Sequence, residues 1–169
     1  MKKIALIGTH GVRKTTHAYG IAHKLKELGN NIEMVSEVAR NCPFPINEKT
    51  TPKAQFWILC TQISREIEKE AASPNYIICD RGTIDNYAYY VSAFGRDKLL
   101  DSLVSDYSKK YDFIFKVPII DSEIEPDGFR STSPDFQKKI DSIINVLLKD
   151  FDIKHYQFTS IDDAIKIIG

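Results

Sequence analysis

The sequence predicts a single α/β domain in which helices cover both faces of a five-stranded parallel sheet. Short apolar runs of strand length alternate along the chain with longer segments of helical periodicity, which is the pattern of consecutive β-α units. A length of 169 residues suits one domain with its own hydrophobic core. No repeat, linker or low-complexity segment interrupts the order, so one domain over residues 1–169 is expected.

The five strands are predicted from the apolar runs. The first run, residues 4–7, is continuous and apolar, as expected of a strand buried on both faces. The remaining strands are predicted over residues 32–35, 76–79, 113–115 and 155–158.

The helices are predicted from their periodicity and end signals. Gly29 and Asn30 end the first helix, and Pro52 suits the first turn of a later one. Helices are expected over residues 15–28, 52–72, 83–94, 96–110, 134–148 and 161–168. Two irregular stretches, 42–52 and 118–133, are candidate functional loops, the second of them a candidate lid.

Composition excludes several classes of protein. The chain has 23 basic and 23 acidic residues, a balance that lacks the positive surface of a nucleic-acid or anionic-membrane binder. No apolar run reaches the roughly 18 residues of a membrane span. Its three cysteines are widely spaced, which indicates neither a disulfide framework nor a zinc site and favours reduced thiols in a cytoplasmic protein.

A phosphate-binding loop follows the first predicted strand. The P-loop pattern is glycine, four residues, glycine, lysine, then serine or threonine. Gly8, Lys14 and Thr15 are in register with it, and the loop opens a predicted helix whose N-terminal dipole favours anions. We therefore expect a P-loop domain with strand order 2-3-1-4-5 that binds ATP and Mg²⁺. The expected nucleotide-binding residues are Gly8, His10, Gly11, Val12, Arg13, Lys14, Thr15 and Thr16.

Arg13 stands where the pattern requires its second glycine. If this position needs a positive φ, a residue with a side chain carries strain of about 1–3 kcal/mol. One interpretation is a weakened or inactive site. Another is an arginine that points away from the loop, or one that adds positive charge to the phosphates.

Asp80 and Arg81 follow the third predicted strand. A carboxylate at this place in P-loop proteins orders Mg²⁺ or its water, so Thr15 and Asp80 are the predicted metal ligands. Arg81 is expected to clamp an anionic group. The plainer interpretations are a turn cap for Asp80 and a solvated surface side chain for Arg81.

Several motifs together resemble the P-loop small-molecule kinases. Asp80-Arg81-Gly82 is similar to the Asp-Arg-x motif of thymidylate kinases and the Glu-Arg-Ser motif of deoxynucleoside kinases. The overall layout most resembles an AAA-type ATPase group that includes ribosylnicotinamide kinase domains. The segments that carry the likeness span most of the chain and lie at residues 36–40, 80–88 and 127–130.

The resemblance implies a carboxylate after the second strand that meets the phosphoryl acceptor, and Glu37 occupies this position. Such a group binds a sugar hydroxyl or accepts its proton. It also implies a lid arginine, for which Arg130 is the candidate. Weaker candidates for the same cleft are Arg40, Gln62 and Asp85. An aromatic group at residues 87–94, together with Phe56 and Trp57, suits base stacking but suits helix packing better.

The predicted function is an ATP- and Mg²⁺-dependent kinase acting on a nucleoside, a nucleotide or a related metabolite. Its partners would be a nucleoside triphosphate and a small acceptor, and the protein would be a monomer or homodimer. A regulatory ATPase and a nucleotide-binding protein impaired by Arg13 are the alternatives. The predicted catalytic residues are Lys14, Glu37, Asp80, Arg81 and Arg130.

Overall fold

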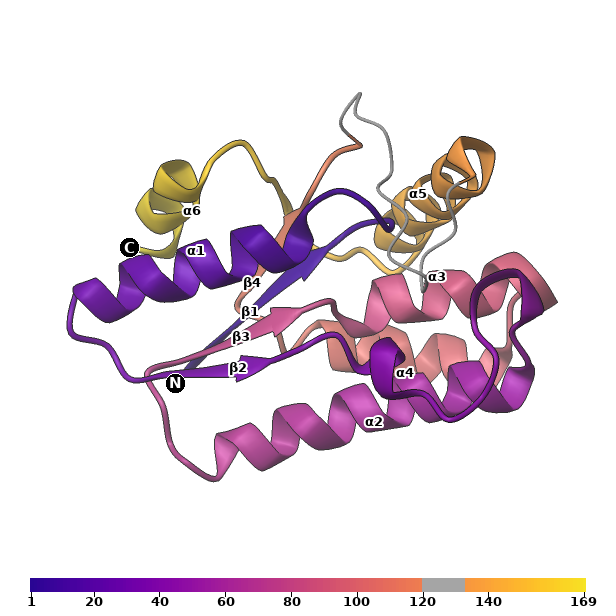
Figure 1. Cartoon of the computed structure of the whole chain (residues 1–169), viewed down its shortest axis with the longest axis horizontal. Helices are drawn as coiled ribbons and strands as arrows, with labels where there is room; N and C mark the ends of the chain where they lie inside the picture. The colour runs from indigo at the N-terminus through magenta and orange to yellow at the C-terminus, as the bar shows by residue number, and fades with distance from the viewer. Residues whose placement is uncertain (120–132) are drawn as a thin grey trace.

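The strands form one parallel sheet whose order is β2-β3-β1-β4-β5, as predicted. The computed structural model describes residues 1–119 and 133–169, and Figure 1 shows the sheet with its covering helices. The strands are β1 (Lys2–Ile7), β2 (Ile32–Val35), β3 (Tyr76–Asp80), β4 (Phe113–Lys116) and β5 (Tyr156–Gln157).

The described helices match the predicted ones within a few residues at each end. They are α1 (Lys14–Glu27), α2 (Pro52–Glu70), α3 (Thr83–Phe94), α4 (Lys98–Ser108), α5 (Pro134–Asp150) and α6 (Ile161–Ile168). The start of α4 differs because Asp97 caps it, accepting hydrogen bonds from the backbone N–H groups of Leu99 and Leu100. The predicted irregular stretch 42–52 is irregular as far as Thr51, apart from one short 3₁₀ helix (Asn47–Lys49), and Pro52 begins α2.

Alternate residues of β1 face two different layers of helices. Ala5 and Ile7 pack in a core with α2, α3, α4 and α5. Ile4 and Leu6 pack in a second core with α1 and α6. This alternation follows from the twofold side-chain period of a strand, and it explains why the run is apolar at every position. Figure 1 shows α1 and α6 on one side of the sheet.

The carboxyl ends of the central strands meet at one edge of the sheet. Leu6 of β1 pairs with Asp80 of β3, and Ile7 pairs with Lys116 of β4. The loops that follow β1, β2 and β3 therefore emerge side by side, which is where ligands of open α/β sheets bind.

A buried polar cluster links β1 to α2 behind this edge. Glu66 is fully buried and accepts hydrogen bonds from Tyr111 Oη at 2.7 Å and Gln62 Nε2 at 2.8 Å. Lys3 Nζ lies 3.2 Å from the Glu66 carboxylate and 2.8 Å from that of Glu70. Burial alone would lower the pKa of Lys3, but Glu70 and Glu66 raise it. The ammonium group is therefore charged at neutral pH.

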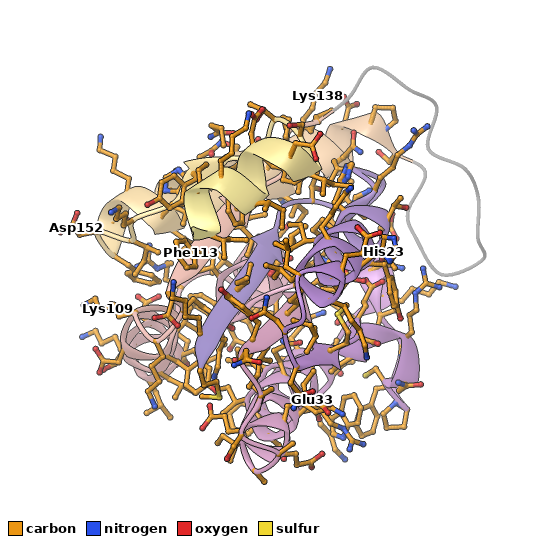
Figure 2. All side chains as sticks on the ribbon, turned by 90° about the vertical axis from the view of Figure 1, so that its left-hand side faces the viewer. His23, Glu33, Lys109, Phe113, Lys138 and Asp152 are labelled. Carbon is orange, nitrogen blue, oxygen red and sulfur yellow. The ribbon has the colours of Figure 1, made fainter. Side chains whose placement is uncertain are left out.

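The outer surface carries exposed polar side chains such as Lys109, Lys138 and Asp152, which project from the periphery in Figure 2. No helix within residues 1–119 or 133–169 has the length and apolarity needed to cross a membrane.

Candidate active site

The loop between β1 and α1 owes its shape to three residues with positive φ. Gly8 has φ 144°, Gly11 φ 77° and Arg13 φ 60°. A Cβ on Gly8 would lie 2.8 Å from the carbonyl oxygen of Val117, so the neighbouring strand end excludes any side chain there. Val12 is buried in the core shared with α1, and this packing anchors the loop.

Arg13 adopts the left-handed conformation that the pattern reserves for glycine. Its backbone has φ 60° and ψ 27°, and its side chain is exposed. This conformation costs a residue with a Cβ about 1–2 kcal/mol relative to glycine. Burial of the imidazole, and after it the positive charge of Arg13, lowers the pKa of His17. The exposed guanidinium of Arg13 therefore lies close enough to His17, in the first turns of α1, to affect its protonation.

The first turn of α1 is an uncapped helix N-terminus without an acidic residue. Among residues 1–119 and 133–169 no side-chain cap is found there, and the sequence of the turn contains no aspartate or glutamate. The exposed N–H groups and the helix dipole make such an end attractive to an anion. Thr16 lies exposed in this turn.

Lys14 is a buried cation whose described neighbours do not neutralise it. Its Nζ donates to the carbonyl oxygen of Thr9 at 2.5 Å, and it forms no ion pair within 4 Å among residues 1–119 and 133–169. Burial, followed by the charge of Arg81, lowers the pKa of Lys14 to about 7 even though nearby carboxylates oppose the shift. An anionic ligand would relieve this cost.

Thr15 and Asp80 form a close pair of oxygen donors. Thr15 Oγ1 donates to Asp80 Oδ2 at 2.5 Å, and Asp80 is buried at the end of β3. The register that places Asp80 beside Leu6 also brings it next to Thr15 in the first turn of α1. Hard oxygen ligands of this kind suit Mg²⁺, which commonly takes one or two protein ligands and completes its shell with phosphates and waters.

His10 is part of the loop, but its ring faces α3 and α5. Its Nδ1 lies 3.1 Å from the hydroxyl of Tyr89, and its ring centroid lies 5.6 Å from that of Phe136. Gln137 Nε2 donates to the His10 carbonyl oxygen at 2.8 Å. The loop is therefore held from outside by the first turn of α5.

Arg81 joins the loop after β3 to the loop after β2. Its Nε donates to Glu37 Oε1 at 2.7 Å, and its Nη1 lies 3.3 Å from Asp85 Oδ2. Arg40 Nε donates to the other oxygen of Glu37 at 3.1 Å. Burial raises the pKa of Asp85 to about 6 despite the adjacent Arg81. These contacts form a compact ionic network, which we call the acceptor network (Glu37, Arg40, Arg81 and Asp85).

The backbone of Arg81 is also constrained. Its φ is 103°, a positive value that side chains rarely adopt. Gln62 Nε2 donates to its carbonyl oxygen at 3.2 Å, and Asp85 Oδ1 accepts from the N–H of Gly82 at 2.7 Å. Gln62 and Asp85 therefore hold the turn that aims the Arg81 guanidinium.

A pocket opens next to the acceptor network, between the loops after β1 and β2 and the helices α2 and α3. Its space, with the solvent in its open mouth included, is about 490 Å³. The walls combine charged, amide, apolar and aromatic groups. They are formed by His10, Glu37, Ala39, Arg40, Ile46, Asn47, Gln55, Ile58, Arg81, Asn86 and Tyr89.

A family model described as an AAA domain matches residues 3–163. The chain belongs to this AAA domain family.

Solved structures show that this AAA domain has the fold of P-loop nucleotide kinases. It is similar to thymidylate kinase from Ehrlichia chaffeensis, with TM-score 0.73 and 19% identity over 99% of this chain and 98% of that chain. It is also similar to deoxyadenosine kinase from M. mycoides with bound dATP, with TM-score 0.64 and 17% identity over 99% and 97% of the two chains. A search of curated proteins found no match.

The AAA domain brings most of the predicted residues to one sheet edge, with some differences in placement. Gln62 does not line the pocket and instead supports the turn at Arg81.

The aromatic candidates divide between the core and two surface hollows. Tyr87 belongs to the core, whereas Tyr89 lines the pocket. Phe56 and Trp57 lie on a separate groove of α2. Arg130 and most of the candidate lid, 118–133, lie outside the described residues.

Two amide side chains of the pocket, Gln55 and Asn86, were not among the site residues predicted from the sequence, although Asn86 lies in the segment 80–88 that carries the family resemblance. Gln55 lies two helical turns before Gln62 on α2, so the i, i+7 spacing was a usable signal. Asn86 lies in the first turn of α3. Its short separation in sequence from Arg81 was the signal that placed it near the site.

Proposed function

We propose that this chain is an ATP- and Mg²⁺-dependent kinase that transfers the γ-phosphoryl group to a nucleoside, a nucleotide or a related metabolite. One observation carries the proposal: a buried lysine and a Thr-Asp oxygen pair lie at the same sheet edge as a pocket that has Glu37 and Arg81 in its wall. The likeness to thymidylate and deoxyadenosine kinase structures supports the same conclusion.

The donor side of the reaction needs groups that stabilise charge on the transferred phosphoryl. The uncapped N-terminus of α1 and the ammonium of Lys14 are fixed before any ligand arrives, so they need not reorganise. Thr15 and Asp80 would hold Mg²⁺, which supplies further charge neutralisation between the phosphates.

The acceptor side needs a group that orients a hydroxyl and takes its proton. In the proposed reaction the acceptor oxygen bonds to the γ-phosphorus, and the bond from that phosphorus to the bridging oxygen breaks. The proton of the hydroxyl passes to Glu37, whose carboxylate is held by Arg40 and Arg81. Arg81 thereby fixes the carboxylate in the wall of the pocket.

The decisive experiment measures ADP production from Mg-ATP by the full chain, with and without nucleosides and their monophosphates. Acceptor-dependent ADP production, lost in Asp80→Asn, supports the kinase. The matched control is Asp106→Asn, which changes a carboxylate exposed on α4 and should not alter the rate. Hydrolysis that no acceptor accelerates would contradict the kinase in favour of a regulatory ATPase. No turnover, even with Arg13→Gly, would indicate a silent nucleotide-binding protein.

Arg13→Gly is expected to change ATP affinity by less than about threefold, a free-energy change well under the 1.4 kcal/mol of a tenfold effect. The reason is that the backbone already has the required positive φ and the side chain is exposed. Titration of a non-hydrolysable ATP analogue into both proteins checks this. A tenfold gain in the glycine variant would show instead that Arg13 impairs the site.

Nucleotide affinity is expected to fall as pH rises above 7.5. Lys14, with its pKa lowered to about 7, is then largely neutral in the free protein, and bound phosphates favour its charged form. Binding therefore takes up a proton, and the Kd rises by up to about tenfold per pH unit. Titrations between pH 7.5 and 9 measure the slope. Lys14→Arg stays charged and should flatten it, whereas a flat wild-type profile would contradict the prediction.

A further inference from the structure

The charges that face the acceptor pocket are already paired with one another. Glu37 accepts from Arg81 on one carboxylate oxygen and from Arg40 on the other. Arg81 is also within 3.3 Å of the carboxylate of Asp85, directly behind the pocket wall. The acceptor network thus pairs the guanidinium groups of Arg40 and Arg81 with carboxylates, and Lys14 and Asp80 add one further charge of each sign close by.

A phosphate monoester would enter this balanced network at a disadvantage. Its negative charge would lie beside the carboxylate of Glu37, which occupies the Nε donor of both arginines. Arg81 and Asp85 are both buried, so rearranging their contact would leave charge unpaired away from water. The network therefore disfavours an acceptor that is itself an anion.

The rest of the pocket offers hydrogen bonds without charge. Asn86 is only 4% exposed, and its Nδ2 has no hydrogen-bond partner among the described residues. Gln55 is also buried and lines the same pocket. Ile46 and Ile58 supply apolar surface, and Tyr89 supplies an aromatic ring. A planar heterocycle with polar edges, joined to a group rich in hydroxyls, suits this combination.

We propose that the acceptor of this chain is an uncharged nucleoside and not a nucleoside monophosphate. This inference rests on the proposed kinase function and narrows it. The nucleoside hydroxyl lies against Glu37, and the base lies between the amide and apolar walls, where Asn86 donates to it. The paired arginines position Glu37 and do not bind a phosphate of the acceptor.

The first test compares binding of adenosine, guanosine, cytidine and thymidine with that of their 5′-monophosphates. Calorimetric titrations use the full chain saturated with a non-hydrolysable ATP analogue and Mg²⁺, so that the donor site is filled. We expect at least one nucleoside to bind tenfold or more tightly than its own monophosphate. Equal or tighter binding of the monophosphates overturns the proposal, and so does the failure of all four nucleosides to bind.

The second test asks whether the charge balance is the cause. Glu37→Gln removes the carboxylate that Arg40 and Arg81 share, while Arg81 keeps its contact with Asp85, so the ratio of monophosphate to nucleoside affinity should rise at least tenfold. Asp85→Asn should shift it in the same direction, and its amide oxygen can still accept from Gly82. The control is Glu33→Gln, which changes a carboxylate on β2. Glu33 pairs with Lys69 away from the pocket, so this change should leave the ratio unaltered (Figure 2 labels Glu33).

Thermal unfolding confirms which variants are folded, and either pocket variant alone suffices for the comparison. A folded variant whose affinity ratio equals that of the wild type overturns the proposal. Efficient phosphorylation of monophosphates would overturn the inference and leave the kinase function intact. Nucleoside binding without acceptor-dependent ADP production would overturn the kinase function and support the choice of ligand.

Discussion

Lys14→Met is expected to reduce the rate of phosphoryl transfer by at least about a hundredfold, since loss of one preorganised charge-stabilising group costs roughly 10²–10³ in kcat. Lys14 is the buried ammonium of the phosphate loop, and its Nζ is held by the carbonyl oxygen of Thr9. Methionine keeps an unbranched stem of similar length and removes the charge together with the hydrogen-bond donor. The measurement is the steady-state rate of acceptor-dependent ADP production.

The stability of the same variant separates a catalytic effect from misfolding. Burial disfavours the charged form of Lys14 in the empty protein and lowers its pKa to about 7. Removing the ammonium should therefore not lower the midpoint of thermal unfolding. Lys24→Met, at an exposed position of the same helix, is the matched control and should leave both rate and stability near wild type. Transfer by Lys14→Met within tenfold of wild type would contradict the assigned role.

Glu66→Ala is expected to lower the free energy of unfolding by about 3–5 kcal/mol, the usual cost of removing one partner of a buried ion pair. Its carboxylate is fully buried and is shared by Lys3, Tyr111 and Gln62. Among the described residues, alanine would leave the charged Lys3 with the partly exposed Glu70 as its remaining ion-pair partner. Urea denaturation at pH 7 measures the loss.

A carboxylate on the same helix provides the control. Glu68 is exposed and pairs with Arg65 on the surface, so Glu68→Ala should change stability by no more than about 1 kcal/mol. Glu66→Gln retains an acceptor for Tyr111 and should be less destabilising than Glu66→Ala. If Glu66→Ala lost less than about 1 kcal/mol, the buried cluster would not have the stabilising role that its geometry indicates.

Local pattern was sufficient to predict most of the fold. A strand buried on both faces must be apolar at every position, as residues 4–7 are, and capping residues such as Pro52 and Gly29 mark helix ends independently of tertiary contacts. The strand order followed from the P-loop after β1. The β5 strand, Tyr156–Gln157, is shorter than the predicted 155–158, although the N–H of Phe158 still donates to the carbonyl oxygen of Lys116 in β4.

The candidate site was less predictable because its geometry depends on contacts between distant segments. Arg81 reaches Glu37 across 44 positions, and nothing local to either residue specifies that pair. Gln62 was a weaker candidate for the cleft, yet its amide donates to the backbone carbonyl oxygen of Arg81 and to Glu66. Asn86 follows a motif of known type, but its burial depends on the packing of α3.

The hydrogen bond from Gln137 to the His10 carbonyl oxygen joins residues 127 positions apart. Through this bond the first turn of α5 supports a loop that lies near the other end of the sequence. A fragment ending at residue 119 would contain every residue of the phosphate-binding motif and lack this brace. The sequence motif alone therefore does not define the folded loop. The loop has all of its supporting contacts only when α5 has packed against it.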